Sequence, residues 1–156
     1  MPARRQGSAR QTLALDTYVK LSRATNSLDS RLAPGLARAG LTESQFGVLE
    51  ALLHVGPQHQ CDLAERILKS SGNMTMVIGN LERRGLVSRE RSAGDRRFIE
   101  VQLTRQGDQL IRKLFPEHAG RLTRLMDTLT EAEQRTLGRL CRKLGLATAA
   151  GGAGSG

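Results

Sequence analysis

Residues 86–104 read LVSRERSAGDRRFIEVQLT, and this stretch predicts a β-hairpin. Ile99, Val101 and Leu103 alternate with polar residues, which is the period-2 pattern of a half-buried strand. Residues 86–91 have the composition of a pairing partner, so we expect them to form the first strand of the hairpin.

The turn of this hairpin is expected at residues 92–95, where Gly94 is free to take a positive φ. The tip would then present Asp95, Arg96 and Arg97 on a narrow finger. A finger with arginines at its end fits the DNA minor groove, whose negative potential attracts guanidinium groups. The alternative is a solvated, charged turn of the kind found on many small domains.

Two short helical segments precede the hairpin. The first is CDLAERILK, residues 61–69, and the second spans about residues 72–84 and ends at Gly85. The second segment carries one apolar stripe at helical spacing, formed by Met74, Val77, Ile78 and Leu81. Two short helices followed by a hairpin predict a winged helix-turn-helix.

Longer helical patterns flank this central part. Residues 12–39 form the first, with Pro34 expected to break or kink it near its end. Thr42 and Gln45 form a capping box for a helix that stops at Gly56-Pro57.

On the C-terminal side, a long helical pattern follows Thr104 and is expected to kink at Pro116. Thr130 and Glu133 form a capping box for a final helix over residues 131–144.

The predicted fold class is therefore mainly α with a small β-hairpin wing: a winged helix-turn-helix with N- and C-terminal helical dimerisation regions. The outer helices are amphipathic over more length than the central part can cover, which favours a homodimer. Two reading heads on one symmetry axis suit a DNA palindrome with half-sites about 34–36 Å apart. The predicted organisation is a flexible basic arm at 1–10, an N-terminal dimerisation helix at 11–40, a DNA-binding domain at 41–104, C-terminal dimerisation helices at 105–146 and a disordered tail at 147–156.

The composition narrows the class of partner. The 156 residues carry a formal net charge of +9, which favours a polyanion such as nucleic acid or an anionic membrane surface. Aromatic residues make up only 3% of the chain, which argues against single-strand or RNA binders that stack bases on aromatic side chains. Double-stranded DNA is the better match. No apolar run is long enough to span a bilayer, and no signal peptide is evident, so we expect a cytoplasmic protein.

With these residues in view, the chain resembles the MarR family of transcriptional regulators over about residues 18–144. The resemblance rests on the segment NLERRGLV at residues 80–87, on Asp95-Arg96-Arg97 and on LTRQG at residues 103–107. It implies a two-fold dimer and a recognition helix, about residues 72–84, that enters the major groove. Family members are mostly repressors. Many release DNA when a small aromatic or phenolic ligand binds, others sense oxidants through cysteine, and a few bind metal.

The candidate DNA-binding residues follow from the two predicted elements. Asn73, Thr75 and Met76 lie near the start of the recognition helix, away from its apolar stripe, and are candidates for base contacts. We expect Arg97 to enter the minor groove and Asp95 to hold it by a charge-assisted hydrogen bond. Candidates for phosphate contacts are Ser70, Ser71, Arg83, Arg84, Arg89, Arg91 and Arg96. For each candidate, the alternative is plain solvent exposure.

Cys61 departs from the MarR pattern, which usually has Ser or Thr at this N-cap position. A helix N-terminus stabilises a thiolate, so Cys61 is a possible redox site, although the adjacent Asp62 opposes this. The alternative is a small, partly buried structural residue. Cys141, on the apolar face of the final helix, is expected in the core or in the dimer interface.

The histidines give weaker indications. His54 and His59 lie near Cys61 in the sequence, but they lack regular ligand spacing, and we expect neither metal nor cofactor. His118 could line an effector pocket or simply lie on the surface.

The sequence thus predicts a sequence-specific, double-stranded-DNA-binding transcriptional regulator. We expect a repressor that binds a palindromic operator as a homodimer and is released by a small molecule or an oxidant. An architectural or adaptor winged-helix DNA-binding protein without ligand sensing is the alternative, and a basic protein of the membrane surface fits less well. The sequence shows no nucleophile–base motif and no phosphate-binding loop, which argues against an enzyme.

Overall fold

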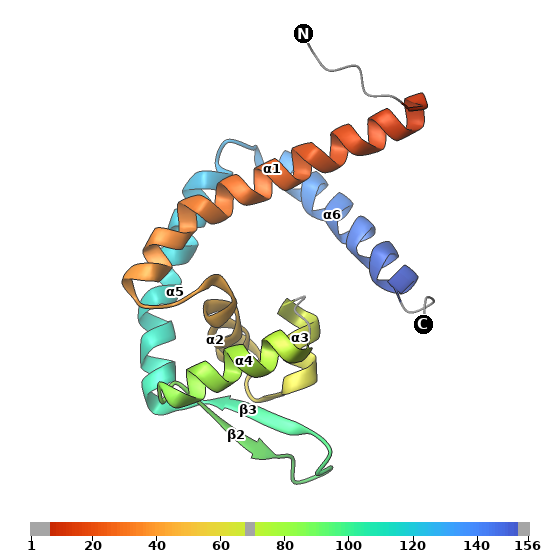
Figure 1. Ribbon diagram of the computed structural model, residues 1–156. Helices are drawn as coiled ribbons and strands as arrows, with labels where there is room; N and C mark the ends of the chain where they lie inside the picture. Colours follow the sequence, from red (N-terminus) through yellow and green to blue (C-terminus); the bar gives the residue numbers. More distant parts are fainter. Residues whose placement is uncertain (1–6, 68–70, 153–156) are drawn as a thin grey trace. The chain divides into compact units, whose positions relative to one another are not determined.

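The structure is a computed structural model that describes residues 7–67 and 71–152. The chain forms two compact units, residues 1–119 and 120–156. The elements in chain order are α1 (Ala9–Arg38), α2 (Glu43–Val55), β1 (Gln58–His59), α3 (Gln60–Ile67), α4 (Ser71–Arg83), β2 (Val87–Arg91), β3 (Ile99–Leu103), α5 (Arg105–Met126) and α6 (Glu131–Gly152). This order confirms the predicted winged helix-turn-helix, with α3 and α4 followed by the β2–β3 hairpin (Figure 1).

The hairpin forms with β3 at its predicted bounds and β2 one residue shorter than expected. Val87 pairs with Leu103 and Arg91 pairs with Ile99 in an antiparallel ladder. A third strand, β1, was not predicted; it pairs with the other side of β3, which gives the sheet order β1-β3-β2. Two residues after a proline are too short to show a period-2 pattern, so this strand left no signal in the sequence.

The predicted turn position was wrong. The tightest turn runs over residues 95–98, where the Phe98 N–H donates to the Asp95 carbonyl at 3.0 Å. Gly94 is not among the glycines with positive φ in the described part of the chain. The turn forms later because the Asp95 carboxylate accepts a hydrogen bond from the Arg97 backbone N–H, at 3.0 Å, which is a local Asx turn.

One hydrophobic core holds the first unit together. It draws buried side chains from α1 to α5 and from the sheet, including Leu49, Leu63, Ile78, Val101 and Ile111. The predicted apolar stripe of α4 is confirmed, since Met74, Ile78 and Leu81 are fully buried. The position and rotation of α4 are therefore fixed by packing rather than by helix propensity alone.

The ends of the helices follow the predicted capping. Thr42 and Gln45 form the capping box of α2, with hydrogen bonds of 3.0 and 3.2 Å, and Thr130 with Glu133 form that of α6. Neither Pro34 nor Pro116 ends its helix, because α1 continues to Arg38 and α5 to Met126.

A junction at the foot of the hairpin joins α4, the wing and α5. Gly85 ends α4 with φ of +71°, a conformation that favours glycine. The Thr104 hydroxyl donates to the Gly85 carbonyl at 2.6 Å and accepts from the Gly107 N–H at 3.0 Å. A Cβ on Gly107 would overlap with the carbonyl oxygen of Leu86. The motif LTRQG is thus a close-packed joint between two helices.

In the second unit, α6 begins at the expected residue but runs to Gly152, well beyond Leu144. Residues 147–152 are therefore helical, which corrects the prediction of a disordered tail; residues 153–156 lie outside the described part, as does most of the predicted arm at 1–10. Ala147 to Ala150 include good helix formers that extend the helix already under way. Across residues 7–67 and 71–152, no helix is long and apolar enough to cross a membrane.

Candidate nucleic-acid interface

The exposed face of α4 follows from the face that it buries. Met74, Ile78 and Leu81 point into the core, so the residues between them on the first turns face outward. Met76 is 71% exposed, and Asn73 is also exposed. An apolar side chain held out in solvent is suited to touching a thymine methyl group.

Thr75 has a partner within the protein. Its hydroxyl accepts a hydrogen bond of 2.9 Å from the Gln60 amide at the start of α3. This bond ties α3 to the outer face of α4 beside Asn73. Of the two predicted serines, Ser70 lies outside the described residues, and so does the side chain of Ser71.

The wing tip carries a bidentate ion pair. Arg97 Nη2 lies 2.6 Å from Asp95 Oδ2, and Arg97 Nε donates to both carboxylate oxygens at 3.0 and 3.1 Å. These hydrogen bonds from the Arg97 side chain hold the pKa of Asp95 below its usual value. The guanidinium stays 84% exposed while the carboxylate fixes its direction, which is the arrangement predicted for the two residues.

The foot of the wing carries a second pair. Arg89 on β2 donates to both carboxylate oxygens of Glu82 on α4, at 3.2 and 2.9 Å. These hydrogen bonds lower the pKa of Glu82 and raise that of Arg89. Because Arg89 is only 29% exposed and its Nε and Nη2 both donate to Glu82, its first role is to attach the wing to α4 rather than to contact phosphate.

The remaining arginines divide in a similar way. Arg84 donates to the Gly40 carbonyl at 2.6 Å, which joins the end of α4 to the loop between α1 and α2. Arg91 donates to the Arg96 carbonyl at 2.7 Å and so braces the wing tip from the end of β2. Arg83 and Arg96 are exposed near these contacts.

A contact that the sequence did not predict connects the wing to β1 and α3. The rings of His59 and Phe98 stack at 4.9 Å between centroids, 10° from parallel. His59 Nδ1 also lies 3.7 Å from Asp62 Oδ2. Their signal is weak because the stack joins residues almost forty positions apart across an unpredicted strand.

Cys61 opens into a small hollow of about 190 Å³ that Arg97 and Phe98 also line. It is exposed and lies inside α3, which begins at Gln60, so both the N-cap position and the buried alternative were wrong. Its Sγ lies 3.9 Å from Asp62 Oδ1. Cys141 is also exposed, which excludes it from the core of its own unit and leaves the interface alternative open.

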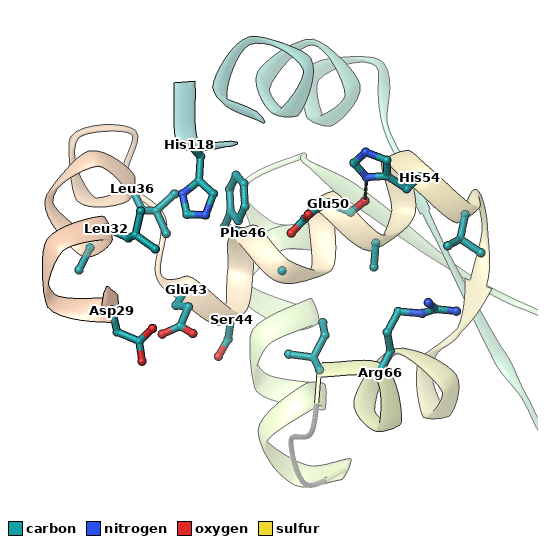
Figure 2. Close-up of a pocket in the computed structure, with 15 residues that line it drawn as sticks. Asp29, Leu32, Leu36, Glu43, Ser44, Phe46, Glu50, His54, Arg66 and His118 are labelled. Atoms are coloured by element: carbon teal, nitrogen blue, oxygen red, sulfur yellow. Dashed lines mark hydrogen bonds between the residues drawn. The ribbon is translucent and has the colours of Figure 1, made fainter. Parts of the chain in front are cut away.

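A larger pocket of about 550 Å³ lies beside α2 in the first unit (Figure 2). Phe46 and Glu50 line it from α2, Leu36 lines it from α1, and His118 lines it from α5. The His118 ring packs on Phe46 with centroids 4.3 Å apart. His118 therefore lines a pocket, and the role of that pocket in binding an effector stays a prediction.

Comparison with known proteins identifies the family to which this chain belongs. A model described as the MarR family matches residues 39–97. The HTH-type transcriptional regulator MhqR of Bacillus subtilis (strain 168) is 32% identical over 133 residues, which cover 85% of this chain and 92% of that protein. The chain belongs to the MarR family. It is a DNA-binding transcriptional regulator with a winged helix-turn-helix fold, as its sequence predicted.

Solved structures agree with the MarR assignment. AbsC, a MarR family transcriptional regulator from Streptomyces coelicolor, superimposes with a TM-score of 0.81 at 23% identity, over 94% of this chain and 99% of that one. BpsR of Bordetella bronchiseptica, whose DNA binding is regulated by 6-hydroxynicotinic acid, is 27% identical with a TM-score of 0.74, over 83% of this chain and 98% of that one.

The MarR model ends within the wing, and the stretch that it covers contains α2, α3 and α4 together with the Asp95–Arg97 pair.

His54, His59 and Cys61 do not form a metal centre: among the described residues, no group of three or more His, Cys, Asp or Glu side chains could hold a metal ion.

Proposed function

We propose that this regulator is a repressor that binds a palindromic operator as a homodimer and leaves it when a small aromatic ligand occupies the pocket beside α2. The observation that carries the DNA-binding part is the wing tip, where Asp95 directs an exposed Arg97 guanidinium outward. A preoriented guanidinium loses little side-chain entropy on entering a minor groove. Met76 and Asn73 on α4 supply the major-groove contacts.

Exposed apolar side chains at both ends of the chain support the dimer. On α1 these are Leu13, Leu15 and Tyr18, and on α6 they are Leu137, Leu140, Leu144 and Leu146. Helices that expose several large apolar residues gain stability when a second copy covers them. Two copies would give two wings and two recognition helices, which suits a palindrome.

The pocket supports control by a ligand. Its volume of about 550 Å³ lies within the range of small-molecule sites, and its lining combines apolar side chains with charged and imidazole groups. Glu50 and Phe46 on α2 connect it to the helix that packs against α4, so a ligand there touches the support of the recognition helix. The related BpsR shows that DNA binding in this fold can respond to an aromatic compound.

Selection from genomic DNA fragments tests the proposal directly. The full chain should enrich one palindromic sequence, with half-sites about 34–36 Å apart, and bind it far more tightly than unrelated duplex DNA. Affinity should fall steeply with salt, because several phosphates are neutralised in each dimer. Equal affinity for all duplexes would instead support an architectural role. The relatives are bacterial, and a bacterial chromosome lies in the cytoplasm, which is where we place this regulator.

A further inference from the structure

The pocket beside α2 is lined by three carboxylates. Asp29 reaches it from α1, and Glu43 and Glu50 reach it from α2. Glu43 and Glu50 are seven residues apart, so they lie on one face of α2, two turns from each other. Within residues 7–67 and 71–152, no ion-pair or hydrogen-bond partner is recorded for any of the three carboxylates, in contrast to Glu82 and Asp95.

Positive charge in the same pocket is limited. Arg66 is exposed, its Nε already donates to the Gln58 side chain at 3.2 Å, and its guanidinium lies at the other end of the pocket from Asp29 and Glu43 (Figure 2). The Gln58 side chain in turn donates to the Ala51 carbonyl at 3.2 Å, and this bond fixes the position of Gln58 beside Arg66. Among the described residues that line the pocket, the guanidinium of Arg66 is thus separated from two of the three carboxylates.

Two imidazoles complete the polar lining. His54 Nδ1 lies 2.9 Å from the Glu50 carbonyl oxygen, so this nitrogen serves its own helix. The His54 ring also meets Phe115 edge-on at 4.7 Å. The His118 ring packs against the buried Phe46 ring with an angle of 39° between their planes, and the two rings give the pocket an aromatic wall for a ligand ring to contact. Apolar side chains from α1 and α3, Leu32, Leu36 and Ile67, close the rest of the wall.

From this geometry we propose that the pocket takes an aromatic ligand that carries no negative charge and donates hydrogen bonds to Glu50 or Glu43, and that it discriminates against aromatic carboxylates. The inference rests on the proposed function, since it names the ligand class of the effector site. A carboxylate lacks a donor for these glutamates and would place a like charge beside them. A hydroxyl or ammonium group gives each glutamate a partner that none of the described residues supplies.

Three phenols of the same shape test this inference. In 4-hydroxyphenylacetate, 2-(4-hydroxyphenyl)ethanol and tyramine, one phenol ring carries a carboxylate, an alcohol or an ammonium group on a short arm. Calorimetric titration of the full chain at neutral pH, without DNA, should show the alcohol and the ammonium compound binding at least about tenfold more tightly than the acetate.

Charge-neutral variants assign the discrimination to the pocket. Glu50→Gln keeps the shape of the side chain and removes its charge, so the ratio of alcohol to acetate affinity should fall at least about threefold. Glu65→Gln is the matched control, because Glu65 is exposed on α3 and does not line the pocket. It should leave the ratio unchanged.

Several outcomes overturn the inference. Tighter binding of the acetate, equal binding of all three compounds, or no binding of any of them below about 1 mM would each contradict it. So would an equal change of the ratio in Glu50→Gln and Glu65→Gln. Selection of an operator is measured separately, on DNA. A wrong ligand class would therefore leave the DNA-binding part of the proposed function unaffected, and failure to select an operator would leave the ligand class unaffected.

Discussion

The two arginine–carboxylate pairs of the wing use the same chemistry in different surroundings. At the foot, Arg89 and Glu82 join β2 to α4, and the arginine is 29% exposed. At the tip, Arg97 and Asp95 are two residues apart within one turn, and the arginine is 84% exposed. The foot pair joins one element to another, whereas the tip pair stays within one turn, where Asp95 also accepts the Arg97 backbone N–H and directs the Arg97 guanidinium. The difference teaches that an ion pair can contribute little to the stability of the fold and still matter, because it sets the direction of an exposed guanidinium.

The largest effect is expected from Arg97→Ala. It should lower operator affinity at least about 30-fold, because each dimer loses two groove contacts worth about 1–3 kcal/mol each. The melting temperature should hardly move, since the side chain is exposed. Fluorescence anisotropy at fixed salt measures the first effect, and a thermal scan measures the second. Arg112→Ala, which also breaks an exposed Arg–Asp pair, is the control; an equal loss in both variants would remove the special role of the tip.

Asp95→Ala should give a smaller effect of diagnostic sign. Removing a carboxylate near DNA ordinarily raises affinity for phosphate. If Asp95 holds Arg97 in its bidentate geometry, affinity should instead fall about threefold to tenfold, because the guanidinium must then be ordered on binding. The same anisotropy titration decides between the two signs. A rise in affinity would mean that the tip pair is only a charged turn.

Glu82→Gln tests the foot pair and should affect stability rather than DNA binding. We expect a loss of about 1 kcal/mol in the free energy of unfolding, discounted for the partial exposure of both side chains. Urea unfolding monitored by circular dichroism measures it. Operator affinity of the folded variant should stay within about twofold of the parent, so a tenfold loss would show that the foot pair also positions the wing for DNA binding.

The smallest effect is a difference in acid response. Hydrogen bonds from Arg89 hold the pKa of Glu82 below its ordinary value of 4.5. Its stabilising contribution is therefore present above that value and is lost as the pH falls through the lowered pKa. The parent should lose stability over this acidic range more steeply than Glu82→Gln. Arg97 also lowers the pKa of Asp95, but this pair lies within one solvent-exposed turn, so Asp95→Asn should depart less from the parent curve than Glu82→Gln does. Parallel curves for all three proteins would contradict the distinction between foot and tip.

Local chemistry made much of this structure predictable. The period-2 alternation located β3, the stripe of Met74, Ile78 and Leu81 located the buried face of α4, and two capping boxes located the starts of α2 and α6. The Asp95–Arg97 contact was also predictable, because its partners are two residues apart.

Features that depend on distant residues were not predictable. The Arg84–Gly40 bond joins residues 44 positions apart, and the His59–Phe98 stack depends on a strand too short to show a pattern. The carboxylates of the pocket come from α1 and α2 and show no common spacing. The end of α6 was misplaced because glycine and alanine together suggest a tail, although alanine also favours helix.

The joint at Thr104 and Gly107 sets the rotational phase of α5. Helical positions advance by about 100° per residue, so one residue inserted between these two would turn every later side chain of α5 through more than a quarter circle. Phe115 and His118 would then leave the faces on which they meet His54 and Phe46. The spacing of LTRQG, at the foot of the wing, therefore fixes how the α5 side chains that line the pocket are aligned with α4.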